Sequence, residues 1–134
     1  MKKLLDRFTT DEAAIARDFF GPQKLAEADL GFEKDEPVGI ATYYWTYASF
    51  AAARGLFVED IFVRPAFRGH GHGKALFHNL AARALAAGAV KLEWLVLDWN
   101  ETAMEFYQKI GARPVDDWRI FRLKGDALEN LARR

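Results

Sequence analysis

Residues Leu56 to Lys74 read L-F-V-E-D-I-F-V-R-P-A-F-R-G-H-G-H-G-K, an apolar stretch that runs into a glycine-rich segment. The apolar part, Leu56 to Val63, predicts a buried strand, and the Arg64-Pro65 pair ends it. Two adjacent acids, Glu59 and Asp60, interrupt this strand, although an unpaired carboxylate is costly to bury. The two acids therefore require either partners or a function.

The glycine-rich segment lies between this strand and a predicted helix. Glycines there let the backbone approach a ligand closely, and exposed amides at a helix start favour anions. The segment does not match the Walker A pattern, because positions 68 and 75 are Arg68 and Ala75, and G-x-G-x-x-G does not fit either. It does match R-x-x-G-x-G at Arg68, Gly71 and Gly73. On its own, this short pattern is compatible with a phosphate site and equally with a ligand-free turn.

The rest of the chain predicts an α/β or α+β fold, a mixed central sheet flanked by helices. A capping box from Thr9 to Glu12 begins the first helix, which ends near Phe20. The next expected elements are the end of a hairpin strand at 32–35, strands at 37–47, 56–63, 91–97 and 118–123, and helices at 74–87 and 103–110. Asn100 or Thr102 is expected to cap the last helix. The helix at 74–87 has an apolar face made of Leu76, Leu80 and Ala84, with Phe77 and Leu85 beside it.

Length and composition exclude several classes of protein. A chain of 134 residues suits one domain, expected to span residues 1–134. Lysine plus arginine equals aspartate plus glutamate at 19 each, so net charge gives no argument for a nucleic-acid partner. The sequence has no apolar run long enough for a membrane span and no signal-peptide pattern, so we expect a cytoplasmic protein without a membrane partner.

The metal-binding residue types are few. Without cysteine, disulfides and thiolate metal sites are excluded. His70 and His72 lie in the glycine-rich segment, but His78 lies well past them on the predicted helix, so the sequence offers no third ligand and no metal is expected. The two loop imidazoles are then either solvent-facing side chains or, when protonated, a source of positive charge beside a phosphate.

Four segments, taken in order, resemble the diamine (spermidine/spermine) acetyltransferase branch of the Gcn5-related N-acetyltransferase (GNAT) superfamily. They are Y-Y-W-T-Y at 43–47, the stretch quoted above, L-V-L-D-W-N-E-T-A-M-E-F-Y-Q-K-I-G-A at 95–112 and D-W-R-I-F-R-L at 117–123. The resemblance implies the GNAT acyl-CoA N-acyltransferase fold. It also implies acetyl transfer from acetyl-CoA, by direct attack, to a primary amine of a small amine or polyamine-like substrate.

The resemblance further implies a role for individual residues. Glu59 would act as the base, through water, and Tyr107 as the acid beside the thioester sulfur. The implied cofactor-binding residues are Ile61, Phe62 and Val63 along the pantetheine, Arg68, Gly69, His70, Gly71, His72, Gly73 and Lys74 around the pyrophosphate, and Asn100 and Tyr107. The implied substrate-binding residues are Glu59, Asp60, Glu93, Trp94 and Trp118.

Elementary chemistry supports both catalytic assignments. An alkyl ammonium group has a pKa of about 10 and cannot attack a thioester until a carboxylate binds it and helps to remove a proton. The leaving thiolate needs an acid, which a tyrosine hydroxyl can supply. Tyr107 could instead be a core aromatic residue with its hydroxyl satisfied at the edge.

Strand alternation separates the two acids unless a bulge intervenes. It groups Glu59 with Phe57, Ile61 and Val63, and Asp60 with Leu56, Val58 and Phe62. We therefore expect Glu59 to be the base. Asp60 is then either a substrate-binding acid or the partner of an arginine such as Arg64 or Arg119.

The chain departs from the family pattern in two places. Family members begin with a strand and a long helix before the region that matches Leu4, so the chain looks N-terminally truncated, and the exposed surface predicts a homodimer. The polyamine enzymes also carry an acid where this chain has Ala48, which leaves open a smaller amine, an amino acid such as a lysine analogue, or a protein amino group. Two alternatives to an enzyme are a truncated, catalytically weak CoA-binding module and a domain whose loop binds nothing.

Overall fold

The computed structural model describes residues 11–133 of the chain. Two compact units can be distinguished, Met1–Leu97 and Asp98–Arg134, and each is described on its own. Thr9, the predicted capping residue of the first helix, lies outside the described residues. Asp11 caps this helix instead, because its side chain accepts a hydrogen bond from the Ala13 amide at 2.8 Å.

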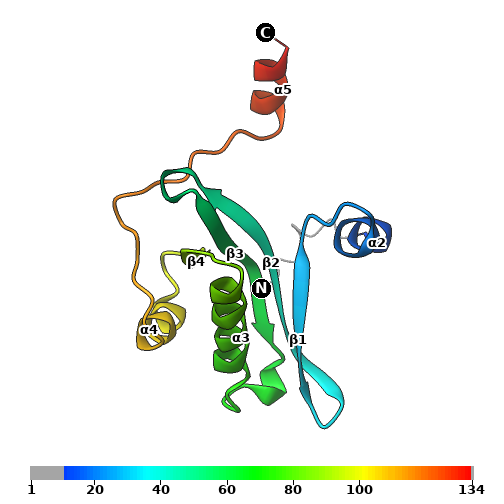
Figure 1. Cartoon of the computed structure of the whole chain (residues 1–134), viewed down its shortest axis with the longest axis vertical. Coiled ribbons are helices and arrows are strands. Elements are labelled where there is room, and N and C mark those ends of the chain that lie inside the picture. Colours follow the sequence, from blue (N-terminus) through cyan, green and yellow to red (C-terminus); the bar gives the residue numbers. More distant parts are fainter. Residues whose placement is uncertain (1–10, 134) are drawn as a thin grey trace. The chain divides into compact units, whose positions relative to one another are not determined.

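Over its described residues, 11–97, the first unit is a mixed four-stranded sheet with a helix on one face, as predicted (Figure 1). Its elements are α2 (Glu12–Phe20), β1 (Glu27–Glu33), β2 (Glu36–Ala48), β3 (Ala53–Val63), α3 (His72–Ala86) and β4 (Lys91–Trp94). The strand order is β1-β2-β3-β4; β1, β2 and β3 pair antiparallel, and β4 pairs parallel to β3. The parallel pair requires a crossover connection, which α3 provides.

Helix α3 builds the core by packing on β2 and β3. Leu76, Leu80 and Ala84 are buried against a cluster that includes Tyr43 and Leu56. The predicted apolar face is confirmed at these positions and at Phe77. Leu85, predicted beside that face, is instead 77% exposed, because it follows Ala84 by a rotation of about 100° around the helix axis.

Strand β1 directs its acidic side chains toward the face that α3 covers. Alternate residues of the strand are less exposed, and the acids among them are partnered. Glu27 accepts from the Trp45 indole at 3.2 Å, and Asp29 accepts from Arg83 of α3 at 2.8 Å. The second carboxylate oxygen of Asp29 is buried, so Arg83 supplies most of the compensation for this acid.

We therefore expect Arg83→Ala to lower the free energy of unfolding by about 1–3 kcal/mol, because it leaves the Asp29 carboxylate poorly compensated. Urea denaturation followed by circular dichroism measures this change. The matched control is Arg17→Ala, which removes an exposed ion pair to the neighbouring Asp18 and should change stability by less than about 0.5 kcal/mol. An equal loss in the free energy of unfolding in both variants would contradict the role of Arg83 as the main partner of the Asp29 carboxylate.

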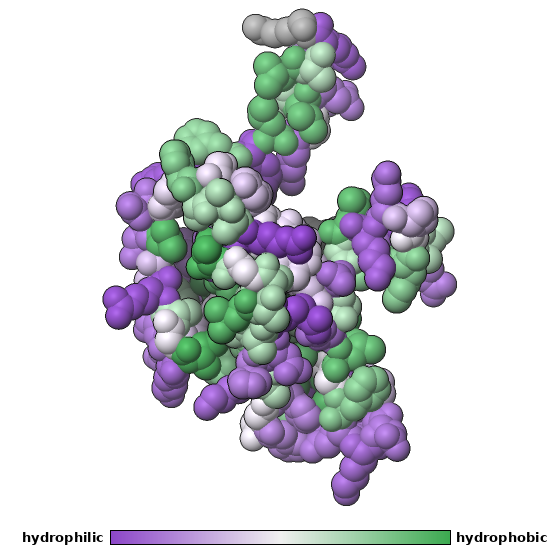
Figure 2. Space-filling model, in the orientation of Figure 1, coloured by the Kyte–Doolittle hydropathy of each residue, from purple (hydrophilic) through white to green (hydrophobic). Residues whose placement is uncertain are grey.

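The described part of the second unit, residues 98–133, contains two helices, α4 (Glu101–Lys109) and α5 (Asp126–Ala132). Asn100 caps α4, as one of the two predicted possibilities, by accepting from the Ala103 amide at 3.2 Å. Helix α5 was not predicted, and its Leu128 and Leu131 are more than half exposed; Figure 2 shows its hydrophobic side in green. Among the described residues, no helix is long and apolar enough to cross a membrane.

The predicted strand at 118–123 is wrong. This segment is irregular, and Trp118, Ile120 and Phe121 are 76%, 62% and 95% exposed. A strand requires a neighbour to satisfy its backbone groups, and the described part of the second unit contains no strand that could pair with it. The predicted strand at 91–97 is also shorter than expected, because regular pairing ends at Trp94.

Candidate active site

A β-bulge lies at the two acids of β3. Thr42 of β2 pairs with Asp60, and the next residue, Tyr43, pairs with Val58, so Glu59 is the extra residue. The bulge reverses the alternation: Leu56 and Val58 face the core before it, and Ile61 and Val63 pack against the core after it. The prediction that Glu59 shares a face with Ile61 and Val63 is therefore wrong, because the bulge interrupts the alternation of side chains along β3.

The bulge places both acids away from the α3 face. Asp60 accepts a hydrogen bond from the Thr42 hydroxyl at 2.6 Å. Glu59 lies close to Tyr44, whose ring is 5.3 Å from that of Phe57. Burial raises the pKa of the Tyr44 hydroxyl, and the nearby Glu59 carboxylate raises it further. Glu59 and Asp60 therefore lie on the same face of the sheet, where both can contact one ligand.

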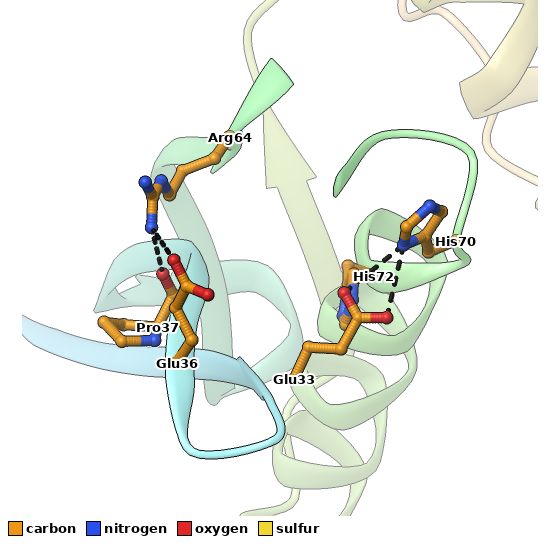
Figure 3. A network of polar contacts seen from close by, with 6 residues as sticks. All are labelled: Glu33, Glu36, Pro37, Arg64, His70 and His72. Atoms are coloured by element: carbon orange, nitrogen blue, oxygen red, sulfur yellow. Dashed lines mark hydrogen bonds and ion pairs between the residues drawn. The ribbon is translucent and has the colours of Figure 1, made fainter. Parts of the chain in front are cut away.

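The predicted pair between Asp60 and Arg64 does not form. Arg64 instead donates to the Glu36 carboxylate at 3.0 Å and to the Pro37 carbonyl at 3.1 Å (Figure 3). Its position just after β3 directs it to the beginning of β2, away from Asp60. Pairing of Asp60 with Arg119, which belongs to the second unit, stays a prediction.

A third carboxylate joins the same face of the sheet. Glu93 is the register partner of Phe57, so its side chain shares the face of Phe57 and Tyr44. Its carboxylate lies 3.0 Å from the Lys91 ammonium. Trp94, the next residue, lies on the α3 face instead, with its ring 4.6 Å from that of Phe77. The structure thus brings Glu59, Asp60 and Glu93 to one face and directs Trp94 to the other.

Beyond the bulge, β3 keeps a neighbouring strand on one side. Residues 60–63 still pair with β2, whereas pairing with β4 ends at Val58 and Trp94. In the described part of the first unit, no strand therefore lines the second edge of Ile61, Phe62 and Val63. Such an edge can pair with an extended ligand through backbone hydrogen bonds.

The glycine-rich loop follows directly after β3. Gly69 and Gly71 have φ angles of +83° and +87°, a region that other residues rarely adopt, so the loop conformation requires glycine there. Arg68 supports the loop, because its guanidinium donates to the Val63 carbonyl at 3.0 Å and lies over the Phe62 ring. Gly71 caps α3 without a side-chain hydrogen bond. The first-turn amides, including those of Gly73 and Lys74, are thus available to an anion.

The remaining predicted site residues belong to the second unit. Tyr107 lies on α4, with its ring 5.8 Å from that of Phe106. A tyrosine hydroxyl has an ordinary pKa of about 10, and burial raises the pKa of the Tyr107 hydroxyl further, so the group stays protonated at neutral pH, as a proton donor must be. Asn100 caps the same helix, and Trp118 lies in the irregular segment after it.

Residues 5–112 match the model of the acetyltransferase (GNAT) family. The chain belongs to the GNAT family. The match covers the bulged strand, the glycine-rich loop and α4, so the geometry described above is that of a GNAT domain. This membership confirms the family and the mixed fold inferred from the four sequence segments.

Several curated relatives of this GNAT chain have the names of amine N-acetyltransferases. An L-ornithine N5-acetyltransferase of Arabidopsis thaliana is 38% identical over 86% of the chain, which spans 47% of that relative. Thialysine N-epsilon-acetyltransferases of Bos taurus and Mus musculus are 34% and 36% identical, over 98% and 99% of the chain and 83% and 84% of their own lengths. The chain therefore spans about half of the Arabidopsis relative and most of the two mammalian ones.

Solved structures agree with the fold. An integron cassette protein from V. cholerae has a TM-score of 0.84 at 25% identity, over 99% of this chain and 84% of its own. A ribosomal-protein-alanine N-acetyltransferase from Brucella melitensis has a TM-score of 0.66 at 27% identity, over 75% of this chain and 72% of its own.

One cluster beside the loop was not predicted. Glu33, at the end of β1, lies between the imidazoles of His70 and His72 (Figure 3). Hydrogen bonding from His70 is the main cause that lowers the pKa of the Glu33 carboxyl. The sequence signal was limited to the paired histidines, because Glu33 lies 37 residues before His70 and reaches it only through the folding of the hairpin.

Proposed function

We propose that this GNAT chain transfers an acetyl group from acetyl-CoA to the side-chain amine of a small basic amino acid. The observation that carries the proposal is the bulge, which turns Glu59 and Asp60 to one face of the sheet together with Glu93. The carboxylates of Glu59 and Asp60, with that of Glu93 already shared with the Lys91 ammonium, favour a cationic substrate. The names of the ornithine and thialysine acetyltransferases support an amino acid of this size.

Acetyl-CoA would bind along the segment that follows the bulge. The pantetheine arm would pair with the open edge of Ile61–Val63, and the pyrophosphate would accept hydrogen bonds from the amides of residues 69–74. Asn100 would contact the cofactor near the start of α4. The open strand edge and the uncapped start of α3 support these placements.

The reaction proceeds by direct attack of the amine on the thioester. Glu59, through a water molecule, removes a proton from the ammonium group, and the free amine nitrogen forms a bond to the acetyl carbonyl carbon. The nitrogen of the tetrahedral intermediate then loses a second proton to solvent, and the intermediate collapses to the amide as the carbon–sulfur bond breaks. Glu59 returns the first proton to solvent. Tyr107 protonates the departing thiolate, and the phenolate recovers its proton from solvent. No step requires a metal ion.

The substrate preference follows from the same face. Asp60 and Glu93 would bind a second positive charge, such as the α-ammonium group of the amino acid, and Trp118 stays a predicted wall residue. Trp94, the other predicted wall residue, packs on the α3 face instead and has no such role in the proposal. Ala48 replaces the acid that the polyamine enzymes carry, which favours a short amino acid over a long polyamine. Spermidine is the second candidate, because a spermidine/spermine acetyltransferase-like protein of Homo sapiens is 28% identical over 98% of the chain.

A thiol-release assay with acetyl-CoA and a panel of amines tests the function. We expect release with L-ornithine and thialysine to exceed release with spermidine at equal concentrations, and release without amine to be at background. Thermal shift with acetyl-CoA, measured alongside, separates the alternatives. A shift without release from any amine would indicate a CoA-binding module, and the absence of both would indicate a domain that binds no acyl-CoA.

A homodimer also stays part of the proposal. Leu30, Ile40 and Phe62 are cross-strand neighbours, and Leu30 and Phe62 are 55% and 48% exposed, so the sheet carries an apolar strip that a second copy could cover. Sedimentation velocity at micromolar concentration checks this expectation, and a folded monomer would contradict it.

A further inference from the structure

We propose that Glu33, His70 and His72 form a binding site for one divalent transition-metal ion, with Zn²⁺ as the best match. The inference concerns a site beside the glycine-rich loop and does not depend on acetyl transfer. The sequence alone offered two histidines and no third ligand. Folding supplies the third ligand from β1, which the hairpin brings next to the start of α3 (Figure 3).

The ligand atoms already converge. His70 Nδ1 lies 3.2 Å from Glu33 Oε1, and His72 Nε2 lies 3.4 Å from Glu33 Oε2. One ligand atom from each of the three side chains lies within 4.8 Å of the other two. In a tetrahedral zinc site with bonds of about 2.0–2.2 Å, ligand atoms lie roughly 3.3–3.6 Å apart. Small side-chain rotations therefore suffice to close the cluster around an ion.

The donor set selects the class of metal. Two imidazoles and one carboxylate suit Zn²⁺ and related transition metals, whereas Mg²⁺ and Ca²⁺ prefer oxygen ligands. Three protein ligands leave at least one position for water or an anion. The carboxylate also offsets the charge of the ion, so the site needs no further acid.

The burial of the cluster is compatible with an ion that enters from solvent. The His72 side chain is 16% exposed, and those of Glu33 and His70 are 35% and 48% exposed. His72 is thus fixed at the start of α3, while the other two ligands line the entrance. The cluster uses ring nitrogens and carboxylate oxygens, so the backbone amides of the loop are left for an anion.

A bound ion would connect two parts of the chain that are distant in sequence. Glu33 ends β1, and the histidines belong to the loop and the first turn of α3. Because metal bonds are stronger than the hydrogen bonds that they replace, the ion would hold the loop against the hairpin. We therefore expect zinc to raise the melting temperature of the protein.

The competing explanation is a metal-free ion pair, in which the Glu33 carboxylate bridges protonated imidazoles. The two explanations differ in one measurable way. A metal site binds zinc through all three side chains, so each substitution weakens zinc binding. A metal-free ion pair predicts no stoichiometric zinc binding that depends on these residues.

The test is a zinc titration of the full chain without a polyhistidine tag and without acetyl-CoA, in competition with a chromophoric chelator. We expect one Zn²⁺ per chain, and at least a tenfold loss of affinity in each of Glu33→Gln, His70→Asn and His72→Asn. The matched control is His78→Asn, an exposed histidine on α3 outside the cluster, which should bind zinc as the wild type does. Mg²⁺ at the same concentration should not compete.

Two readouts keep the proposal falsifiable if one variant folds poorly. Zinc should raise the melting temperature of the wild type and of His78→Asn but not of His72→Asn, and Co²⁺ should give the intense visible bands of a four-coordinate site in the same two proteins. Absence of zinc binding to the wild type would overturn the proposal. Zinc binding as tight as that of the wild type in Glu33→Gln, His70→Asn and His72→Asn would overturn it as well.

Discussion

Replacement of Glu59 by glutamine should lower kcat by about 10²–10³-fold while acetyl-CoA affinity stays within about twofold of the wild type. Glutamine keeps the size of the side chain but cannot accept the proton of the substrate ammonium group. The loss should therefore appear in turnover rather than in cofactor binding. Steady-state thiol release and acetyl-CoA titration measure the two quantities separately.

The pH dependence of this variant distinguishes a base from a structural acid. With an amine of pKa about 10, the fraction of free amine rises about tenfold per pH unit below that value. Activity of Glu59→Gln should rise with this fraction as the pH increases, because the free amine no longer needs the carboxylate. The matched control is Glu12→Gln, at the exposed start of α2, which should retain wild-type turnover. Wild-type turnover in Glu59→Gln would contradict the assigned role.

Replacement of Tyr107 by phenylalanine should lower kcat by about 10²-fold with little change in acetyl-CoA affinity. Phenylalanine preserves the packing of the ring on α4 and removes only the hydroxyl. The Tyr107 side chain is partly buried, and its hydroxyl, whose ordinary pKa of about 10 is raised by burial, is protonated at neutral pH, so the wild type has a proton to donate. Thiol release under saturating amine measures the effect.

The leaving group provides the specific test of Tyr107 as an acid. An acetyl thioester of a more acidic thiol departs without help, so the deficit of Tyr107→Phe should shrink with such a donor. The matched control is Tyr47→Phe, which removes the hydroxyl of an exposed tyrosine at the end of β2 and should not alter turnover. An equal deficit with both donors would show that the Tyr107 hydroxyl acts in some way other than proton donation to the leaving group.

The sequence was sufficient for the parts of the fold that depend on local patterns. The alanine- and leucine-rich period at Leu76, Leu80 and Ala84 predicted the buried face of α3, and Asn100 was predicted as a possible cap of α4. The glycines at 69 and 71 likewise indicated a backbone conformation that other residues rarely adopt. Each of these predictions depends only on residues that lie close together in the sequence.

The features that the sequence did not predict depend on contacts between distant segments. The bulge at Glu59 is a property of the pairing between β2 and β3, so alternation within β3 alone gave the wrong faces. The partner of Arg64 is Glu36 rather than Asp60 for the same reason. Residues 118–123 alternate like a strand, but alternation does not provide the neighbour that a strand needs.

The cluster at Glu33 illustrates the same limit for a binding site. The two histidines can be seen in the sequence as neighbours of the glycines. His78 was the only third ligand considered there, and it lies too far along the chain, so no metal site was expected. Carboxylates are too common in any sequence to be assigned to a site without the fold. The hairpin that ends β1 beside the loop made the assignment possible.

The most direct test of the central claim is the mass spectrometric analysis of L-ornithine after incubation with the protein and acetyl-CoA. The proposed reaction predicts ornithine with one acetyl group on the side-chain nitrogen, formed in proportion to the thiol released. Fragmentation of the product distinguishes this nitrogen from the α-nitrogen. Acetylation of the α-nitrogen, or unmodified ornithine despite demonstrated binding of acetyl-CoA, would contradict the account.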